Sequence, residues 1–196
     1  MNDVFYLNNL NKEYVTYTSL LEHISATKVI TTSGVFESTK DFLLNFILGI
    51  SNNIDLVLID AGCEYQGYAA DITRTFPING RFTDAQKELY TLVLDTQVYC
   101  ISQLVPGNTI PNVMQSAIKM ITQGLLDLGI LTGTLDSCIE QEAHKAFFMH
   151  GLGHYLGLDV HDVGNYKENG QDKVLEVGMV LTVEPGIYVS HKADVP

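Results

Sequence analysis

The pattern of hydrophobic and polar positions predicts two neighbouring strands in the first half of the chain. Residues 55–60 hold a continuous apolar run closed by the carboxylate of Asp60, which is typical of a buried strand that ends in a turn. Residues 67–76 predict a second strand, because a proline and an Asn-Gly turn stop them. If the two strands form a hairpin that turns near residues 65–66, Asp60 stands opposite Asp71.

Two amphipathic helices are predicted after these strands. Thr83 and Gln86 form a capping box, and one face stays apolar until a Pro-Gly pair at 106–107 ends the helix. The second helix should begin near Pro111 and end before Gly129. Its apolar residues recur at helical spacing and should lie in the core: Ile110, Val113, Met114, Ala117, Ile118, Ile121 and Leu125.

Weaker patterns complete the expected fold. Residues 15–35 are rich in β-branched side chains and predict short strands, whereas residues 39–50 predict a helix. Residues 136–146 predict a shorter helix, and residues 173–188 a strand pair in which an apolar run ends at Glu184. Strands and helices alternate loosely, so the fold class is α/β of the α+β type, with antiparallel hairpins.

Composition narrows the classes of partner. The chain has 196 residues, enough for one substantial domain, and its net charge is −12, with 23 acidic against 11 basic residues. Such a surface repels nucleic acid and anionic lipid, because phosphate binding needs clustered lysine and arginine. We therefore expect neither as a partner, and the charge leaves a homo-oligomer open.

The amino terminus and the cysteines indicate a soluble, cytoplasmic protein. The first residues lack the basic flank and long apolar run of a secretory signal. The most apolar window, residues 42–50, is far shorter than the ~20 residues that span a bilayer. The three cysteines are widely spaced and odd in number, so we expect reduced, mostly buried thiols.

The candidate chemistry centres on residues 150–164, HGLGHYLGLDVHDVG, which hold three of the six histidines. Each glycine inside a helix would cost about 1 kcal/mol, so a strand or glycine-rich loop is favoured. In an extended conformation His150 and His154 point to the same side. On spacing alone, a structural histidine and a metal ligand or proton carrier are both open.

Carboxylates at apolar places add to this picture. Asp60, Asp71 and Glu184 each lie in or at the end of a predicted strand, where an unpaired charge is costly unless a base, a shared proton or a metal ion compensates it. With His154 they form a ligand set that suits Mn²⁺ and is compatible with Co²⁺ or Zn²⁺. Bridging carboxylates can hold two ions about 3.5–4 Å apart. Turn residues and a packed core histidine are the alternatives.

Three strings then identify a family. DAGCEYQGYAADITRTFPINGRFT, HGLGHYLGLDVHDVG and EVGMVLTVEPGIYV resemble, in order and spacing, the signature blocks of the aminopeptidase P branch of the pita-bread metallopeptidases. The resemblance runs from about residue 55 to the end. It implies a pita-bread fold, a curved antiparallel sheet backed by helices. Residues 54–196 would form an incomplete catalytic domain, and residues 1–53 a divergent segment that does not match the family.

The resemblance also implies roles for individual residues. Asp60, Asp71, His154 and Glu184 correspond to ligands of two divalent metal ions, with Mn²⁺ expected and Co²⁺ or Zn²⁺ as alternatives. His150 and His161 correspond to histidines that lie close to the substrate and assist proton transfer. The implied reaction is hydrolysis of the bond between an N-terminal residue and a following proline by a metal-bound hydroxide. The implied partners are peptides with proline at the second position.

Departures from the family keep alternatives open. The family's fifth ligand, a glutamate in a downstream RIED-like block, has no counterpart here, and an upstream histidine of the family does not map onto His23. We therefore expect an impaired second metal site and reduced or no activity. The alternatives are a prolidase, which cleaves Xaa-Pro dipeptides, and a non-catalytic fragment or pseudo-peptidase. We expect His144 and His191 at the surface and Arg74 in a structural role.

Overall fold

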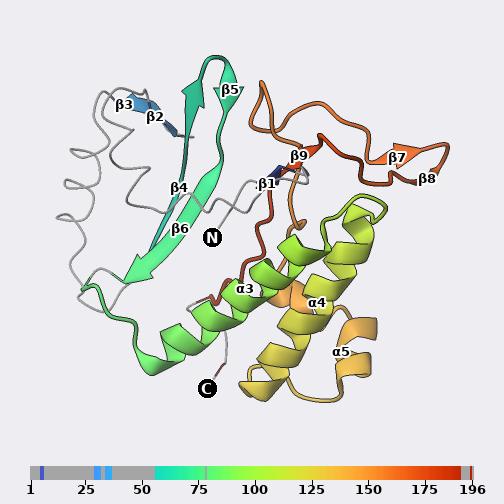
Figure 1. Ribbon diagram of the computed structural model, residues 1–196. Coiled ribbons are helices and arrows are strands. Elements are labelled where there is room, and N and C mark those ends of the chain that lie inside the picture. Colours follow the sequence, from blue (N-terminus) through green and yellow to red (C-terminus); the bar gives the residue numbers. More distant parts are fainter. Residues whose placement is uncertain are drawn as a thin grey trace.

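The computed structural model of the chain describes residues 5–6, 29–31, 34–36, 56–77, 79–190 and 195. The helix expected over residues 39–50, together with His23 and His191, lies outside the described residues. Within the described part, a twisted antiparallel sheet stands beside a group of helices (Figure 1). This arrangement agrees with the expected α+β class.

The sheet is built around one long strand. Its members are β2 (Val29–Thr31), β3 (Gly34–Phe36), β4 (Leu56–Tyr65), β5 (Tyr68–Ala69) and β6 (Ile72–Pro77), all paired antiparallel. β4 pairs with β2 on one edge and with β5 and β6 on the other. The two strands predicted over residues 55–76 are therefore confirmed as one hairpin, with a break between β5 and β6.

The register of this hairpin differs from the prediction. Gln66 and Gly67 form the turn, with φ of 53° and 87°, so both central residues have the positive φ of the two-residue turn that suits a twisted hairpin. Asp60 consequently pairs with Thr73 and not with Asp71. The observed pairing is shifted by two residues, which is one full repeat of the side-chain alternation. Side chains that were predicted to share a face of the sheet therefore still share it.

The two long helices agree with the prediction. α3 (Asp84–Gln103) begins with the expected capping box: the Gln86 amide N–H donates to Thr83 Oγ1 at 3.3 Å, and the Thr83 N–H donates to Gln86 Oε1 at 2.9 Å. α4 (Ile110–Asp127) packs beside α3 (Figure 1). The helix predicted over residues 136–146 is instead divided into α5 (Leu135–Glu140) and the 3₁₀ turn η2 (Ala143–Ala146), because Glu142 adopts a left-handed φ of 53°.

The strand pair expected over residues 173–188 is wrong. β9 (Val180–Leu181) is the strand of that segment, and it pairs with β1 (Phe5–Tyr6). The short hairpin lies earlier, between β7 (Lys167–Glu168) and β8 (Gln171–Asp172). Residues 182–184 still run extended, but their backbone groups bond to the glycine-rich loop at 152–154 and not to a sheet.

The core lies between the helices and two other segments. One segment leads into the glycine-rich loop, and the other follows β8. As predicted, the α4 stripe is central: Val113, Ala117, Ile118, Ile121 and Leu125 are buried. Phe148, Leu175 and Val183 complete it from the other segments. Cys63, Cys100 and Cys138 are free thiols, and burial raises the pKa of Cys100 to about 11, which keeps that thiol protonated. In the described part of the chain, no helix is long and apolar enough to cross a membrane.

We expected His144 at the surface, and this prediction is wrong. The side chain is buried in η2 with 4% exposure. The residue periodicity gives no sign of this, because a 3₁₀ turn after a broken helix turns side chains to new directions. Its Nδ1 has no hydrogen-bond partner among the described residues, and burial lowers the pKa of the ring. Arg74 donates to the Thr73 carbonyl at 2.9 Å, in keeping with a structural role.

Replacing His144 by leucine should make stability less sensitive to acid. Burial in the folded state disfavours the charged ring, so the pKa of His144 lies below its ordinary value of 6.5 and the unfolded state binds more protons as the pH falls through that value. The native protein should therefore lose stability from about pH 6.5 downward, and the variant should lose less. Urea midpoints at pH 7.5 and 5.5, with a chelator present, measure this. An equal loss in both proteins would contradict it.

Candidate metal centre

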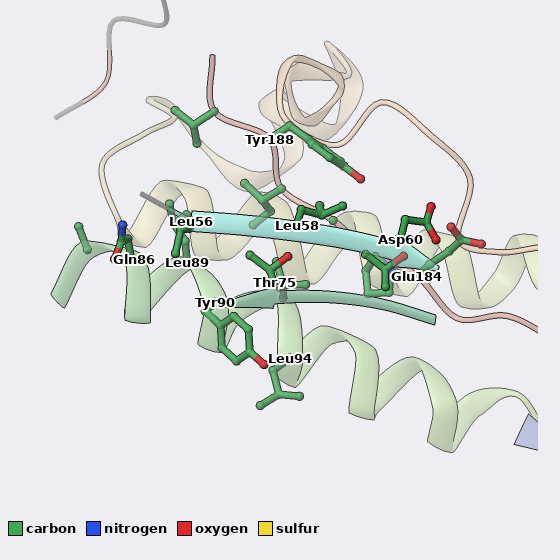
Figure 2. A pocket seen from close by; sticks show the side chains of 17 residues that line it. Leu56, Leu58, Asp60, Thr75, Gln86, Leu89, Tyr90, Leu94, Glu184 and Tyr188 are labelled. Atoms are coloured by element: carbon green, nitrogen blue, oxygen red, sulfur yellow. The ribbon is translucent and has the colours of Figure 1, made fainter. Parts of the chain in front are cut away.

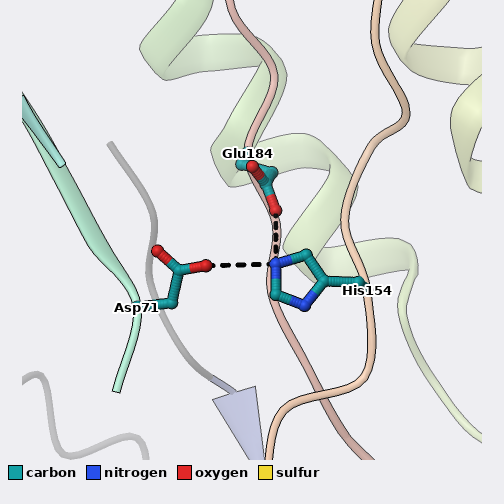
Figure 3. A group of neighbouring side chains, drawn as sticks. All are labelled: Asp71, His154 and Glu184. Atoms are coloured by element: carbon teal, nitrogen blue, oxygen red, sulfur yellow. Dashed lines mark hydrogen bonds and ion pairs between the residues drawn. The ribbon is translucent and has the colours of Figure 1, made fainter. Parts of the chain in front are cut away.

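Three side chains from distant segments meet beside the sheet (Figure 3). His154 Nε2 lies 3.0 Å from Asp71 Oδ2 and 3.2 Å from Glu184 Oε1. One ligand atom from each residue lies within 4.8 Å of the other two. Asp71 comes from the break between β5 and β6, His154 from the glycine-rich loop, and Glu184 from the extended segment after β9.

The histidine is oriented by its other nitrogen. His154 Nδ1 lies 2.9 Å from the backbone carbonyl of Tyr155, an acceptor that requires a proton on Nδ1. In the neutral ring, Nε2 then carries the free lone pair, and this lone pair faces both carboxylates. Imidazole ligands of metal ions are commonly held in this way, with the second ring nitrogen donating to a backbone carbonyl. The tautomer therefore fits a metal site.

The electrostatics of the cluster favour positive charge between the carboxylates. Burial by itself lowers the pKa of His154, but the hydrogen bonds to Asp71 and Glu184 outweigh it and raise that pKa to about 10. The bond from His154 in turn lowers the pKa of Asp71. A proton on His154 thus supplies positive charge between two carboxylates. A divalent ion coordinated by these three residues would supply more, so the donor set and its charge fit such an ion.

Asp60 lies at the border of this cluster. Its side chain and that of Glu184 meet at one end of a groove (Figure 2). Partial desolvation and the charge of Asp71 raise the pKa of Asp60, which indicates that the two carboxyl groups interact despite the shifted register. Asp60 is not within the compact group formed by Asp71, His154 and Glu184.

A glycine permits the approach of the two aspartate strands. Any side chain at position 62 would clash with the carbonyl oxygen of Ala70, the residue just before Asp71. The Ala70 N–H donates to the Cys63 carbonyl at 2.8 Å, so the chain is held against β4 at this point. Glycine is therefore needed here for close packing of backbone on backbone.

The two remaining predicted histidines occupy different places. His161 packs edge-on against His154, with ring centroids 4.2 Å apart, so it borders the cluster. His150 lies farther along the same loop, where its Nε2 is 3.1 Å from the Tyr188 hydroxyl and its ring packs against Phe148. The structure thus brings His161 to the cluster, whereas His150 lies against Tyr188, a residue of the groove that Asp60 and Glu184 also line.

Tyr188 was missed by the sequence reasoning. Tyr188 lines the same groove as Asp60 and Glu184, and burial together with the charges of Glu184 and Asp60 raises the pKa of its hydroxyl. The only signal in the sequence was its place four residues after Glu184 in the block EVGMVLTVEPGIYV. That block drew attention to its carboxylate and not to its aromatic ring.

A groove of about 390 Å³ leads away from the carboxylates (Figure 2). Its floor is the face of β4 and β6 that carries Leu56, Leu58 and Thr75. Leu89 of α3 and Ile187 of the C-terminal segment are among the residues of its walls. The groove is therefore apolar along its length and acidic at one end, which suits a ligand with a positive end and an apolar body.

An antiparallel sheet beside helices, with carboxylates and an oriented histidine gathered at one place, is typical of metal-dependent hydrolases. The comparisons with known proteins define the class more closely. The chain belongs to metallopeptidase family M24, whose family model matches residues 31–195.

Several relatives in this family share one name. The chain is 62% identical over 147 residues to the Xaa-Pro aminopeptidase of Haemophilus influenzae, and the match covers 74% of this chain and 34% of that protein. It is 57% identical over 144 residues to the Escherichia coli Xaa-Pro aminopeptidase, covering 72% of this chain and 32% of that protein. The chain thus spans about a third of the length of these curated relatives.

Solved structures give the same result. A zinc-substituted Escherichia coli aminopeptidase P in complex with product matches with a TM-score of 0.71 and 54% identity, covering 74% of this chain and 33% of that one. Pseudomonas aeruginosa aminopeptidase PepP matches with a TM-score of 0.70 and 50% identity, covering 72% and 32%. The predicted family and its pita-bread fold, present here in part, are confirmed.

Proposed function

We propose that this chain contributes the metal centre of an Xaa-Pro aminopeptidase, with Asp60, Asp71, His154 and Glu184 as ligands of two divalent ions. The observation that carries the proposal is His154: its Nδ1 is committed to a backbone carbonyl, while its Nε2 lies between Asp71 and Glu184. The names of the relatives support the reaction. Residues 54–196 would form the catalytic part, and residues 1–53 a divergent segment whose strands β2 and β3 extend the sheet of β4.

Mn²⁺ is the ion that the mainly carboxylate donor set favours, with Co²⁺ or Zn²⁺ as alternatives. Bound ions would polarise the substrate carbonyl and lower the pKa of water at the site. The protein residues then have distinct tasks. The carboxylates hold the ions and give the pocket the negative charge that attracts a free N-terminal amine. His161, which borders the cluster, and His150, which contacts Tyr188, would contact the scissile peptide and transfer protons.

The proposed substrates are peptides with proline at the second position. A prolidase would prefer the dipeptide Xaa-Pro, whereas an aminopeptidase of this kind accepts a longer peptide. A non-catalytic protein of the same fold would bind metal or peptide without turnover. The names of the relatives favour the aminopeptidase.

Elemental analysis of the dialysed protein, run beside hydrolysis assays with Xaa-Pro-Xaa and Xaa-Pro peptides, tests the proposal. We expect bound divalent ion and, among active preparations, preference for the longer peptide. Preference for the dipeptide would favour the prolidase, and metal without turnover would favour the non-catalytic alternative. Absence of any metal binding at millimolar Mn²⁺ or Co²⁺ would overturn the proposal.

Metal binding should release a proton near neutral pH. In the metal-free protein His154 has a pKa of about 10, so at pH 7.5 its Nε2 carries a proton that must leave before the nitrogen can coordinate. Affinity should therefore fall as the pH is lowered below that pKa. Calorimetric titration with Mn²⁺ in two buffers of different ionisation enthalpy should show release of about one proton per protein chain as the ion that His154 binds is taken up. Identical heats in both buffers would contradict this expectation.

A further inference from the structure

The buried hydroxyl of Thr182 contacts both His154 and Glu184, two residues of the candidate metal centre. Thr182 is 2% exposed, and its Oγ1 lies 2.7 Å from Glu184 Oε1, a distance at which the hydroxyl donates to the carboxylate. The same oxygen accepts the backbone N–H of His154 at 2.9 Å. Thr182 thus links the two residues through a single atom.

The backbone around Thr182 is fixed on both sides. Its N–H donates to the His154 carbonyl at 2.9 Å, and the Glu184 N–H donates to the Leu152 carbonyl at 2.7 Å. From α3, the buried Gln97 donates through Nε2 to the Val183 carbonyl at 2.9 Å. Three hydrogen bonds, two to the glycine-rich loop and one from α3, therefore hold residues 182–184 in place, and the Thr182 hydroxyl has little freedom to move.

We propose that Thr182 is a positioning residue of the metal centre: its hydroxyl holds the Glu184 carboxylate and the His154 backbone in the relative placement that metal coordination needs. This inference rests on the proposed function, because it takes Glu184 and His154 to be ligands. The hydrogen bond from the Thr182 hydroxyl occupies one lone pair of Glu184 Oε1 and does not involve Glu184 Oε2. The carboxylate is then oriented before any ion arrives.

A carboxylate without this bond would rotate about its own side-chain torsions, and binding would have to restrict it. Hydrogen-bond partners of metal ligands typically contribute 10–100-fold to metal affinity. Loss of the hydroxyl should therefore weaken metal binding by roughly this factor. It should not move the fold of the remaining core, since the methyl group of threonine stays buried in the isosteric valine.

The test compares Thr182→Val, which removes the hydroxyl, with Thr182→Ser, which keeps it. Co²⁺ titration of the chelator-treated proteins gives affinity, and the visible absorption of bound Co²⁺ reports ligand geometry without any assay of activity. We expect Thr182→Val to bind Co²⁺ about 10–100-fold more weakly with an altered spectrum, and Thr182→Ser to stay within about threefold of the native protein. Thr122→Val is the matched control, because Thr122 is also fully buried but donates to the Ile118 carbonyl within α4.

Native affinity and spectrum in Thr182→Val would overturn the inference and leave the proposed function standing. Equal loss in the serine and valine variants would also overturn it, because the methyl group would then be the important part. If the native protein itself fails to bind Co²⁺, the proposed function falls first. Should Thr182→Val not fold, shown by circular dichroism, Thr182→Ala takes its place with the same expected loss.

Discussion

Asp71→Asn is expected to abolish tight binding of divalent metal. The Asp71 carboxylate is buried and accepts from His154 Nε2 at 3.0 Å, so it is a direct member of the cluster. An amide of the same shape is neutral and removes one of the charges that hold a cation. The loss should exceed the ~10–100-fold that is typical for mutating a mere hydrogen-bond partner of a ligand. Elemental analysis after dialysis and calorimetric titration with Mn²⁺ measure it.

Asp172→Asn provides the matched control for this experiment. Asp172 lies exposed in β8, in the short hairpin outside the cluster, and the same change of charge there should leave metal content unaltered. Full metal content and ordinary Xaa-Pro turnover in Asp71→Asn would remove Asp71 from the ligand set.

Local patterns predicted the helices well. The capping box of Thr83 and Gln86 and the apolar stripe of α4 depend on residues within a few positions of one another. Such patterns carry their own information, because the helix period determines which side chains share a face. The long apolar strand β4 was found for the same reason.

Features set by distant or single residues could not be predicted. The register of the β4–β6 hairpin depends on the positive φ of Gln66, a residue that shows no strong preference for it. β9 pairs with β1, more than 170 positions earlier in the chain, and this pairing replaces the strand partner expected nearby. His144 is buried only because Glu142 breaks the preceding helix.

The candidate centre lies between these cases. The sequence placed Asp71 within a predicted strand, Glu184 at the end of another and His154 in a strand or glycine-rich loop, and the structure brings the three together. Their meeting depends on backbone contacts between residues 152–154 and 182–184, which no periodicity reveals. The resemblance to a family supplied that information, whereas Tyr188 and Thr182, which no ligand pattern marks, were overlooked. The roles of all six residues, Asp60, Asp71, His150, His154, His161 and Glu184, stay predictions.

Gly153→Ala is expected to separate the two segments that carry His154 and Glu184. A Cβ at position 153 would meet the Thr182 backbone oxygen, and the chain could relieve this contact only by moving the loop away. The bonds from the Thr182 and Glu184 N–H groups at 2.9 and 2.7 Å would then lengthen or break. Two lost hydrogen bonds at ~1 kcal/mol each, plus ~1–3 kcal/mol of overpacking, give a destabilisation of about 3–5 kcal/mol.

Gly151→Ala is the control that isolates this effect, because a Cβ at Gly151 meets nothing within 4 Å. Both variants add one methyl group to the same loop, so a general effect of glycine on chain entropy is common to them. Urea unfolding in the presence of chelator should show the large loss in Gly153→Ala alone, and Co²⁺ titration should show weakened binding in that variant only. Equal stability of the two variants would mean that the loop can shift without cost, and the close approach at Gly153 would then not determine how His154 faces Glu184.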